Sequence, residues 1–190
     1  GARIKEHARF HEMGKLLANS GHEDSILMMD ENILDGNMAH KLLEEAPRYL
    51  QEDWFEEFPE HLRPSKICLV LGGLGARSEL HLDPLSWTGW NCLLEGTKLW
   101  RFYTQKATFH GDVLLQRPFG IGPKAEFCSI GQSVISSIDT WRFRDFRKGD
   151  GLPVPVEYLQ RPGETLIFPG TWWHQTYHLS HTVALAGQIL

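Results

Sequence analysis

After about residue 60, the chain consists of short β-forming stretches separated by turns that contain glycine or proline. Apolar runs of strand length, with almost no helical periodicity between them, are typical of packed antiparallel sheets. This pattern restricts the fold class to mainly β and predicts an antiparallel jelly roll. The strands that we expect cover 66–71, 98–103, 133–138, 154–160, 165–168, 172–178 and 182–189.

The first part of the chain has a different pattern. Apolar residues recur at helical spacing over 5–18 and again over 37–46, with a candidate strand at 25–29 between them. The second helix has to end before Pro47, because the residue before a proline disfavours helical geometry. We therefore expect short N-terminal helices ahead of the strands.

A length of 190 residues suffices for one domain with a sizeable core. We expect a single domain over 1–190, with a mostly helical flank at 1–65 and a jelly-roll core at 66–190. The formal net charge of -5 gives no general electrostatic case for a nucleic-acid partner. The longest purely apolar run, 67–71, is far too short to span a membrane.

The cysteines suggest a compartment. There are three of them, an odd number, and none has the C-x-x-C spacing of a thiolate metal site. Neither a disulfide framework nor a thiolate zinc site is indicated. The pattern favours a reducing, intracellular location, in the nucleus or the cytoplasm.

One short segment carries metal-ligand chemistry. His81 and Asp83 lie two positions apart, just before Pro84, so both side chains leave the same face if the segment is extended. An imidazole and a carboxylate on one face form two thirds of the 2-His-1-carboxylate set that holds non-haem Fe(II). A third ligand must come from a distant histidine.

Three histidines near the end of the chain are candidates for that ligand. His174 and His178 have the same strand parity, so periodicity does not separate them, and His181 has the opposite parity. His174 follows a Pro-Gly break at the mouth of a strand, which suits a metal at the opening of a barrel. From the residues alone, His174 is the first choice and His178 the alternative.

Two apolar runs flank Glu95-Gly96, and this pattern predicts a tight hairpin. In that hairpin Leu93 pairs with Lys98 and Asn91 pairs with Trp100, so Asn91 and Lys98 share a face. A lysine on the inner face of an apolar hairpin is costly without an anionic partner. We expect that partner to be the carboxylate of a ligand.

Several motifs occur in a characteristic order along the chain. They are His81-Leu82-Asp83-Pro84-Leu85, Trp90-Asn91, Glu95-Gly96-Thr97-Lys98-Leu99-Trp100 and Pro169-Gly170-Thr171-Trp172-Trp173-His174. Over about 25–188 the chain resembles the Jumonji-C (JmjC) family of Fe(II)- and 2-oxoglutarate-dependent oxygenases. Within that family it is most similar to the phosphatidylserine-receptor-like branch of lysyl hydroxylases and arginine demethylases. The resemblance implies a cupin-like double-stranded β-helix.

The resemblance also implies roles for individual residues. His81, Asp83 and His174 would be the catalytic metal ligands, His174 because the family ligand stands in a W-W-H run. Fe(II) would bind 2-oxoglutarate and O2, Lys98 would pair with the distal carboxylate of 2-oxoglutarate, and Asn91 would bond near its metal-bound end.

The chain departs from the family at one position. The family carries a threonine hydroxyl in the last strand beside the lysine, and the corresponding residue here is Ala186. Ser78 is our candidate replacement at the cosubstrate, with Tyr103 and Thr176 as alternatives. The missing hydroxyl puts the affinity for 2-oxoglutarate in question more than metal binding.

The function expected by resemblance is hydroxylation or demethylation of a protein side chain, most similar to lysyl hydroxylation. The partner would be a protein or peptide, such as a histone or an RNA-associated protein, with no membrane. The alternative is a catalytically weak or inactive JmjC module that acts as a protein-binding scaffold. A metal cupin without 2-oxoglutarate would leave Lys98 unexplained.

The charged stretch 139–151 is expected to be a solvated loop, with contact to an acidic or peptide substrate as its alternative.

Overall fold

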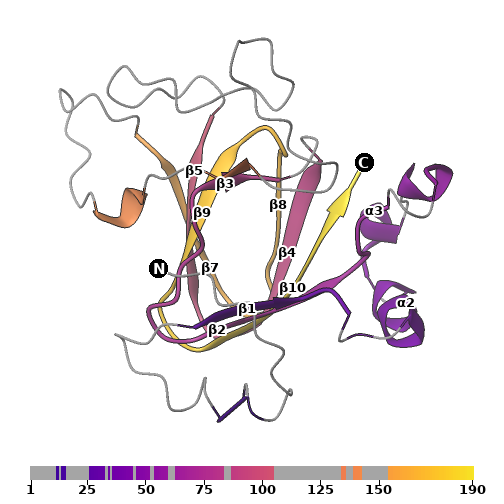
Figure 1. Cartoon of the computed structure of the whole chain (residues 1–190), viewed down its shortest axis with the longest axis horizontal. Helices are drawn as coiled ribbons and strands as arrows, with labels where there is room; N and C mark the ends of the chain where they lie inside the picture. The colour runs from indigo at the N-terminus through magenta and orange to yellow at the C-terminus, as the bar shows by residue number, and fades with distance from the viewer. Residues whose placement is uncertain are drawn as a thin grey trace.

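Two five-stranded antiparallel sheets face each other, and short helices lie outside them (Figure 1). The predicted mainly β jelly roll with short N-terminal helices is therefore confirmed. The structure is a computed structural model. It describes residues 12, 14–15, 26–32, 34, 36–44, 46–51, 54–59, 63–83, 87–104, 134–135, 139–142 and 154–190.

The two sheets draw their strands from distant parts of the chain. The first sheet contains, in spatial order, β1 (Leu27–Asp30), β2 (Cys68–Gly72), β10 (Thr182–Ile189), β4 (Thr88–Glu95) and β8 (Thr165–Phe168). The second contains β6 (Val134–Ile135), β3 (His81–Leu82), β9 (Trp173–His178), β5 (Lys98–Tyr103) and β7 (Val156–Gln160). Each pair of neighbours in either sheet is antiparallel.

Helical segments precede or interrupt the strands. They are α2 (Gly36–Glu44), α3 (Arg48–Gln51), and the 3-10 helices η1 (Trp54–Glu57) and η4 (Thr140–Arg142). The helix predicted over 37–46 corresponds to α2. The helix predicted over 5–18 lies almost wholly outside the described residues.

The predicted hairpin around Glu95-Gly96 is wrong. β4 and β5 are consecutive in the chain, but β4 pairs with β10 and β8, whereas β5 pairs with β9 and β7. The chain therefore crosses from one sheet to the other at Gly96, where φ is 87° and an added Cβ would meet the backbone of His181. A Glu-Gly turn can form either a hairpin within one sheet or a connection between two sheets, so the local sequence does not distinguish the two.

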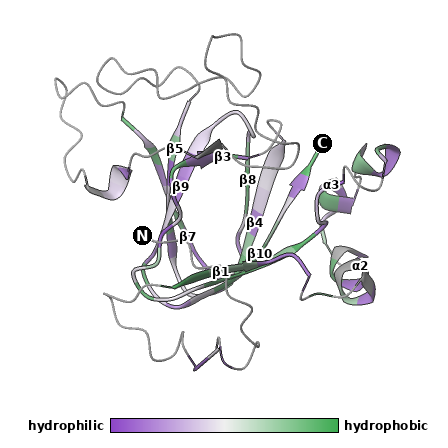
Figure 2. Cartoon of the chain, viewed as in Figure 1, coloured by the Kyte–Doolittle hydropathy of each residue, from purple (hydrophilic) through white to green (hydrophobic). Residues whose placement is uncertain are grey.

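The first sheet is covered on both faces, which explains why all five residues of β2 are buried. On one face, Cys68 and Val70 pack with Leu93 and Ala184. On the other, Leu50 of α3 packs with further apolar residues, among them Ile67, Trp90, Leu185 and Ile189. Figure 2 shows the hydrophobic colour concentrated in this sheet around β1.

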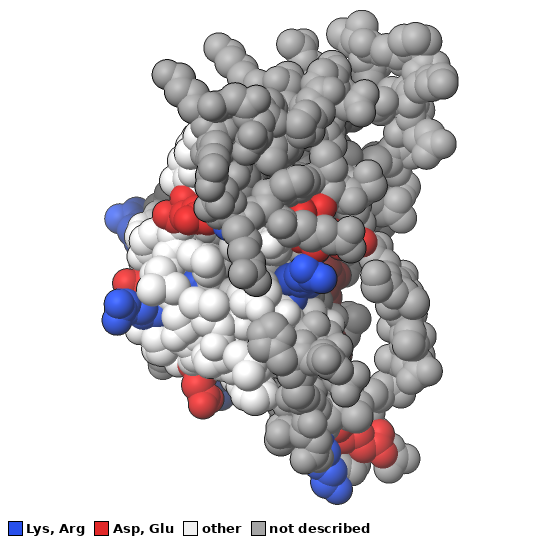
Figure 3. Space-filling view, turned by 90° about the vertical axis from the view of Figure 1, so that its left-hand side faces the viewer, with Lys and Arg blue, Asp and Glu red and all other residues white. Residues whose placement is uncertain are grey.

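The second sheet has an edge strand, most of whose side chains are exposed to solvent. β7 is an edge strand with exposed apolar side chains, including Val156 and Tyr158. Figure 3 shows this side of the molecule, where the charged groups of the described residues are scattered over a mostly uncharged surface. In this view the described residues form no continuous basic patch. Among the described helices, none is long and apolar enough to cross a membrane.

One expected loop is partly structured. The stretch 139–151 was predicted to be solvated, but its described part, 139–142, packs on the second sheet, where Thr140 is fully buried. The prediction failed for these residues because their partners, such as Gln175 and Arg101, lie on strands far away in sequence.

Candidate metal centre

Two strands of the second sheet bring the candidate ligands together. His81 on β3 and His174 on β9 are cross-strand partners, and Asp83 follows directly after β3. The Nε2 atoms of both histidines lie 3.8 Å from Oδ1 of Asp83. All three ligand atoms lie within 4.8 Å of one another. Two bonds of about 2.1 Å to one ion reach about 4.2 Å, which covers both 3.8 Å separations.

Hydrogen bonds orient both imidazole rings. Nδ1 of His81 lies 2.7 Å from the carbonyl oxygen of Glu79, and Nδ1 of His174 lies 3.1 Å from that of Trp172. A carbonyl oxygen only accepts, so each Nδ1 carries the hydrogen and each Nε2 presents a lone pair toward Asp83. Metal-bound histidines have this arrangement, so the residues present fit a divalent metal ion.

The burial of His174 keeps its ring neutral. Its side chain is 3% exposed, and the centroid of its ring lies 4.6 Å from that of Phe168. Burial, together with the neighbouring His81, lowers the pKa of His174 to about 4. The lone pair of Nε2 is therefore available to a metal at neutral pH.

A glycine makes room for the carboxylate, and we did not predict its role from the sequence. A Cβ added at Gly89 on β4 would run into the ring of Phe168 and come within 2.7 Å of Oδ2 of Asp83. Gly89 therefore lets the first sheet approach the ligands held by the second. A glycine inside a strand pattern is a signal for such close approach.

Lys98 is a buried cation inside the barrel. It is 1% exposed, its Nζ donates a hydrogen bond of 3.1 Å to Oδ1 of Asn91, and Nζ lies 5.3 Å from the centroid of the Trp100 ring. Burial lowers the pKa of Lys98 to about 8. Within the described part of the chain, no carboxylate pairs with this ammonium, and an anionic ligand would complete its environment.

Buried hydrogen bonds hold Asn91 in place. Gln160 donates from Nε2 to the carbonyl oxygen of Asn91 at 2.8 Å, and its Oε1 accepts a bond of 2.8 Å from Nε1 of Trp100. Asn91 and Lys98 meet across the interior, although the hairpin that predicted their proximity does not exist. Side chains that face the interior come close together both in the predicted hairpin and in the observed pair of facing sheets.

The position at which the resemblance predicts a threonine hydroxyl, Ala186, lies beside Asn91. Ala186 is the cross-strand partner of Asn91 on β10 and offers no hydrogen bond. Thr176 shares the inward-facing parity of His174 on β9. Tyr103 instead has the outward parity of Arg101 on β5, and burial raises the pKa of its hydroxyl.

Ser78 lies in the segment just before β3. Its Oγ accepts a hydrogen bond of 2.9 Å from the backbone N–H of Thr176, which ties this segment to β9. The hydroxyl hydrogen of Ser78 can still donate elsewhere. Its role at the cosubstrate stays a prediction.

His178, the alternative third ligand, lies elsewhere. It is the cross-strand partner of Lys98 and does not belong to the His81–Asp83–His174 cluster. Its Nδ1 lies 2.5 Å from Oγ1 of Thr182, and its ring occupies the space beside Gly72 on β2. Burial and the nearby Lys98 lower the pKa of His178 to about 3. His178 is therefore a buried, neutral side chain that packs between β9 and β2 near Lys98.

The chain forms a jelly-roll barrel with two histidines and a carboxylate inside it. This combination of fold and ligand set is that of a metal-binding cupin. The comparison with family models agrees: the chain belongs to the cupin-like domain family, whose model matches residues 5–186. Its relatives are JmjC proteins, and the predicted resemblance is thereby confirmed.

Three curated relatives show the extent of the similarity. Lysine-specific demethylase JMJ21 of Arabidopsis thaliana is 30% identical over an alignment of 181 residues, and the match covers 86% of this chain and 16% of that protein. The bifunctional arginine demethylase and lysyl-hydroxylase psr-1 of Caenorhabditis elegans is 25% identical over 173 residues, 89% of this chain and 41% of psr-1. The 2-oxoglutarate and iron-dependent oxygenase JMJD4 of Mus musculus is 26% identical over 144 residues, 73% of this chain and 30% of JMJD4. The chain spans less than half the length of each.

Proposed function

We propose that this chain is an Fe(II)- and 2-oxoglutarate-dependent oxygenase that hydroxylates or demethylates a protein side chain. The observation that carries this proposal is the convergence of His81, Asp83 and His174, with both Nε2 atoms close to one carboxylate oxygen. The names of the relatives support it, because JMJD4 is named as an oxygenase that depends on iron and 2-oxoglutarate.

Iron and 2-oxoglutarate, when bound, supply the oxidising chemistry that turns a C–H bond of the substrate into C–OH and yields succinate and CO2. One oxygen atom of O2 enters the substrate and the other enters succinate. Two electrons come from the C–H bond and two from the decarboxylation, so O2 is fully reduced. On an N-methyl group, the hydroxylated carbon then leaves as formaldehyde, which amounts to demethylation.

The residues of the chain bind and orient the reactants. His81 and His174 are fixed by bonds from Nδ1 to backbone carbonyls, so little reorganisation is needed when a metal enters. The ammonium of Lys98 is suited to the distal carboxylate of 2-oxoglutarate, with Asn91 beside it. Phe168, packed on the His174 ring, helps to exclude water from the ligands.

Lysyl hydroxylation is the first reaction to test. psr-1 is named as both an arginine demethylase and a lysyl-hydroxylase, and JMJ21 as a lysine-specific demethylase. These names support a protein or peptide substrate whose modified side chain is lysine or methylarginine.

One observation favours a second candidate function, a protein-binding module with weak or no catalysis. Ala186 stands next to Asn91, where the family carries a hydroxyl for the cosubstrate. A chain that binds metal but not 2-oxoglutarate would act only as a scaffold.

The decisive experiment measures succinate and the peptide product together. The chain is incubated with Fe(II), 2-oxoglutarate and peptides that contain lysine or methylarginine, and mass spectrometry follows an added oxygen atom or a lost methyl group. We expect turnover that His81→Ala abolishes. Calorimetry with 2-oxoglutarate separates the two functions: tight binding contradicts the scaffold, whereas metal binding without 2-oxoglutarate binding contradicts the oxygenase.

A further inference from the structure

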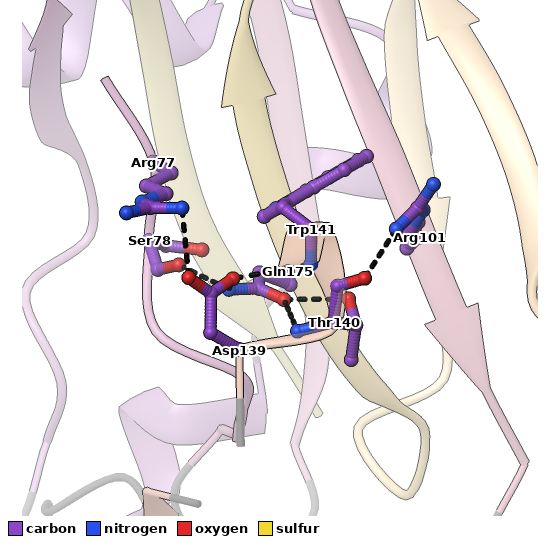
Figure 4. A network of polar contacts seen from close by, with 7 residues as sticks. All are labelled: Arg77, Ser78, Arg101, Asp139, Thr140, Trp141 and Gln175. Atoms are coloured by element: carbon purple, nitrogen blue, oxygen red, sulfur yellow. Dashed lines mark hydrogen bonds and ion pairs between the residues drawn. The ribbon is translucent and has the colours of Figure 1, made fainter. Parts of the chain in front are cut away.

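A polar network covers the outer face of the second sheet and centres on Gln175, the residue after the ligand His174 (Figure 4). Side chains alternate along β9, so Gln175 points outward where His174 points inward. Gln175 is nevertheless only 1% exposed, because the Asp139–Arg142 turn packs over it. We call this turn the brace.

The carboxamide of Gln175 uses every bond that it can make. Nε2 donates to the carbonyl oxygen of Ser78 at 2.9 Å and to Oδ1 of Asp139 at 3.3 Å. Oε1 accepts from the backbone N–H of Thr140 at 3.0 Å and from its hydroxyl at 2.6 Å. A glutamine has two donors and two acceptor sites, so this side chain is held in one orientation.

The brace is itself well anchored. Oδ1 of Asp139 accepts a bond of 3.1 Å from the N–H of Trp141, and Oδ2 forms an ion pair of 2.7 Å with Nη1 of Arg77. Arg101, the cross-strand partner of Gln175, donates a bond of 2.6 Å to the carbonyl oxygen of Thr140. Its guanidinium lies 4.0 Å from the centre of the Trp141 ring.

These bonds join the two segments that carry the histidine ligands. Ser78 stands three positions before His81, and Gln175 stands directly after His174. The β3–β9 ladder has one residue pair in register, His81 with His174, and the segment before it is joined to β9 by the Arg77–Tyr177 bridge and by a backbone bond from Ser78 to Thr176. The distance between the two imidazoles therefore depends on side-chain bonds as well as on the ladder.

We propose that Gln175 is a positioning residue for the metal centre, which together with the brace fixes the spacing between His81 and His174. This inference rests on the proposed function, because it presupposes that the three ligands hold a metal. Groups that hydrogen-bond metal ligands typically change metal affinity by about 10- to 100-fold when they are lost, and we expect an effect of this order from Gln175, which bonds to the segments next to the ligands.

The test measures Co(II) binding to the metal-free chain, by calorimetry and by the visible absorption bands that report coordination geometry. Gln175→Leu removes all four hydrogen bonds. Gln175→Glu keeps the shape and the acceptor for Thr140 but loses donation to Ser78, and it places a carboxylate beside Asp139. Leu50→Ala is the control, because Leu50 is buried against the outer face of the other sheet and its loss lowers the melting temperature without touching the site.

We expect both Gln175 variants to bind Co(II) about 10- to 100-fold more weakly, with altered absorption bands, while Leu50→Ala binds as the wild type does. If Gln175→Leu is too unstable to study, the isosteric Gln175→Glu decides. Wild-type affinity and spectrum in a folded Gln175 variant overturn the inference, as does an equal loss in Leu50→Ala. If the wild-type chain binds no Co(II), the proposed function fails first and the inference falls with it.

Discussion

The burial of Lys98 places a charge where water cannot solvate it. Burial lowers its pKa from 10.5 to about 8. At about 1.4 kcal/mol per pKa unit, this shift corresponds to roughly 3 kcal/mol of unfavourable free energy in the protonated state at neutral pH. A bound carboxylate would offset this cost, which is the reason to expect an anion at this point of the barrel.

We therefore expect Lys98→Met to raise the melting temperature of the metal-free chain and to abolish 2-oxoglutarate binding. The gain would be about 1–3 kcal/mol, because Asn91 loses a hydrogen-bond donor while the desolvated charge disappears. Thermal unfolding and calorimetry measure the two effects. Lys66→Met, which removes a half-exposed lysine paired with Glu56, should leave 2-oxoglutarate binding unchanged. Destabilisation by Lys98→Met with intact binding would contradict the assignment.

Gly89 permits the contact between the first sheet and the ligands. In Gly89→Ala, the new methyl group would press on Phe168 and on Oδ2 of Asp83. We expect Co(II) affinity to fall by about 10- to 100-fold, as for other groups that orient metal ligands. Gly187→Ala is the matched control, because its Cβ would come within 2.7 Å of the Trp90 ring and of the Lys66 carbonyl oxygen and is close to none of the three candidate ligands. Equal Co(II) affinities in the two variants would show that crowding at Gly89 does not reach the ligands.

At the scale of strands and turns, the sequence predicts what depends on near neighbours. The extent of β8 follows from the Pro-Gly pairs on either side of it, and the extent of β10 and the inward parity of His81 and His174 follow from alternation. The shared face of Asn91 and Lys98 was expected from a hairpin that does not exist, and the two residues meet because their sheets face each other.

Contacts between residues that are far apart in the chain are harder to predict from local sequence. The crossing at Gly96 depends on which strands lie beside β4 and β5, which local residue types do not encode. The burial of Thr140 under its bonds to Gln175 depends likewise on a residue far away in the chain. The convergence of His81, Asp83 and His174 could be predicted because their spacing and motif context are local, whereas the residues that pack behind them could not.

For the whole molecule, the candidate metal site links β3 to β9, whose ladder has one residue pair in register. Any ligand that binds only the folded chain stabilises it, by about 2.7 kcal/mol at a free concentration 100 times its dissociation constant. We expect the melting temperature to rise by several degrees when Co(II) is added and to fall when a chelator removes it. His81→Ala should remove this dependence, and His181→Ala, which changes an exposed histidine outside the cluster, should preserve it. An equal response in both variants would place the stabilising metal elsewhere.

Acid should destabilise the metal-free chain through its buried histidines. The pKa of His178 is lowered from 6.5 to about 3, and that of His174 from 6.5 to about 4. Below pH 6.5 the unfolded chain takes up protons at both residues while the folded chain does not, so stability falls as the pH falls through this window. Each residue contributes up to about 1.4 kcal/mol per pH unit. Denaturant unfolding between pH 7 and pH 5 should show a slope that His178→Asn reduces by about one proton. The slope is the informative quantity, because His178→Asn also loses the bond to Thr182 and lowers stability at every pH. An unchanged slope would mean that His178 takes up its proton at the same pH in both states.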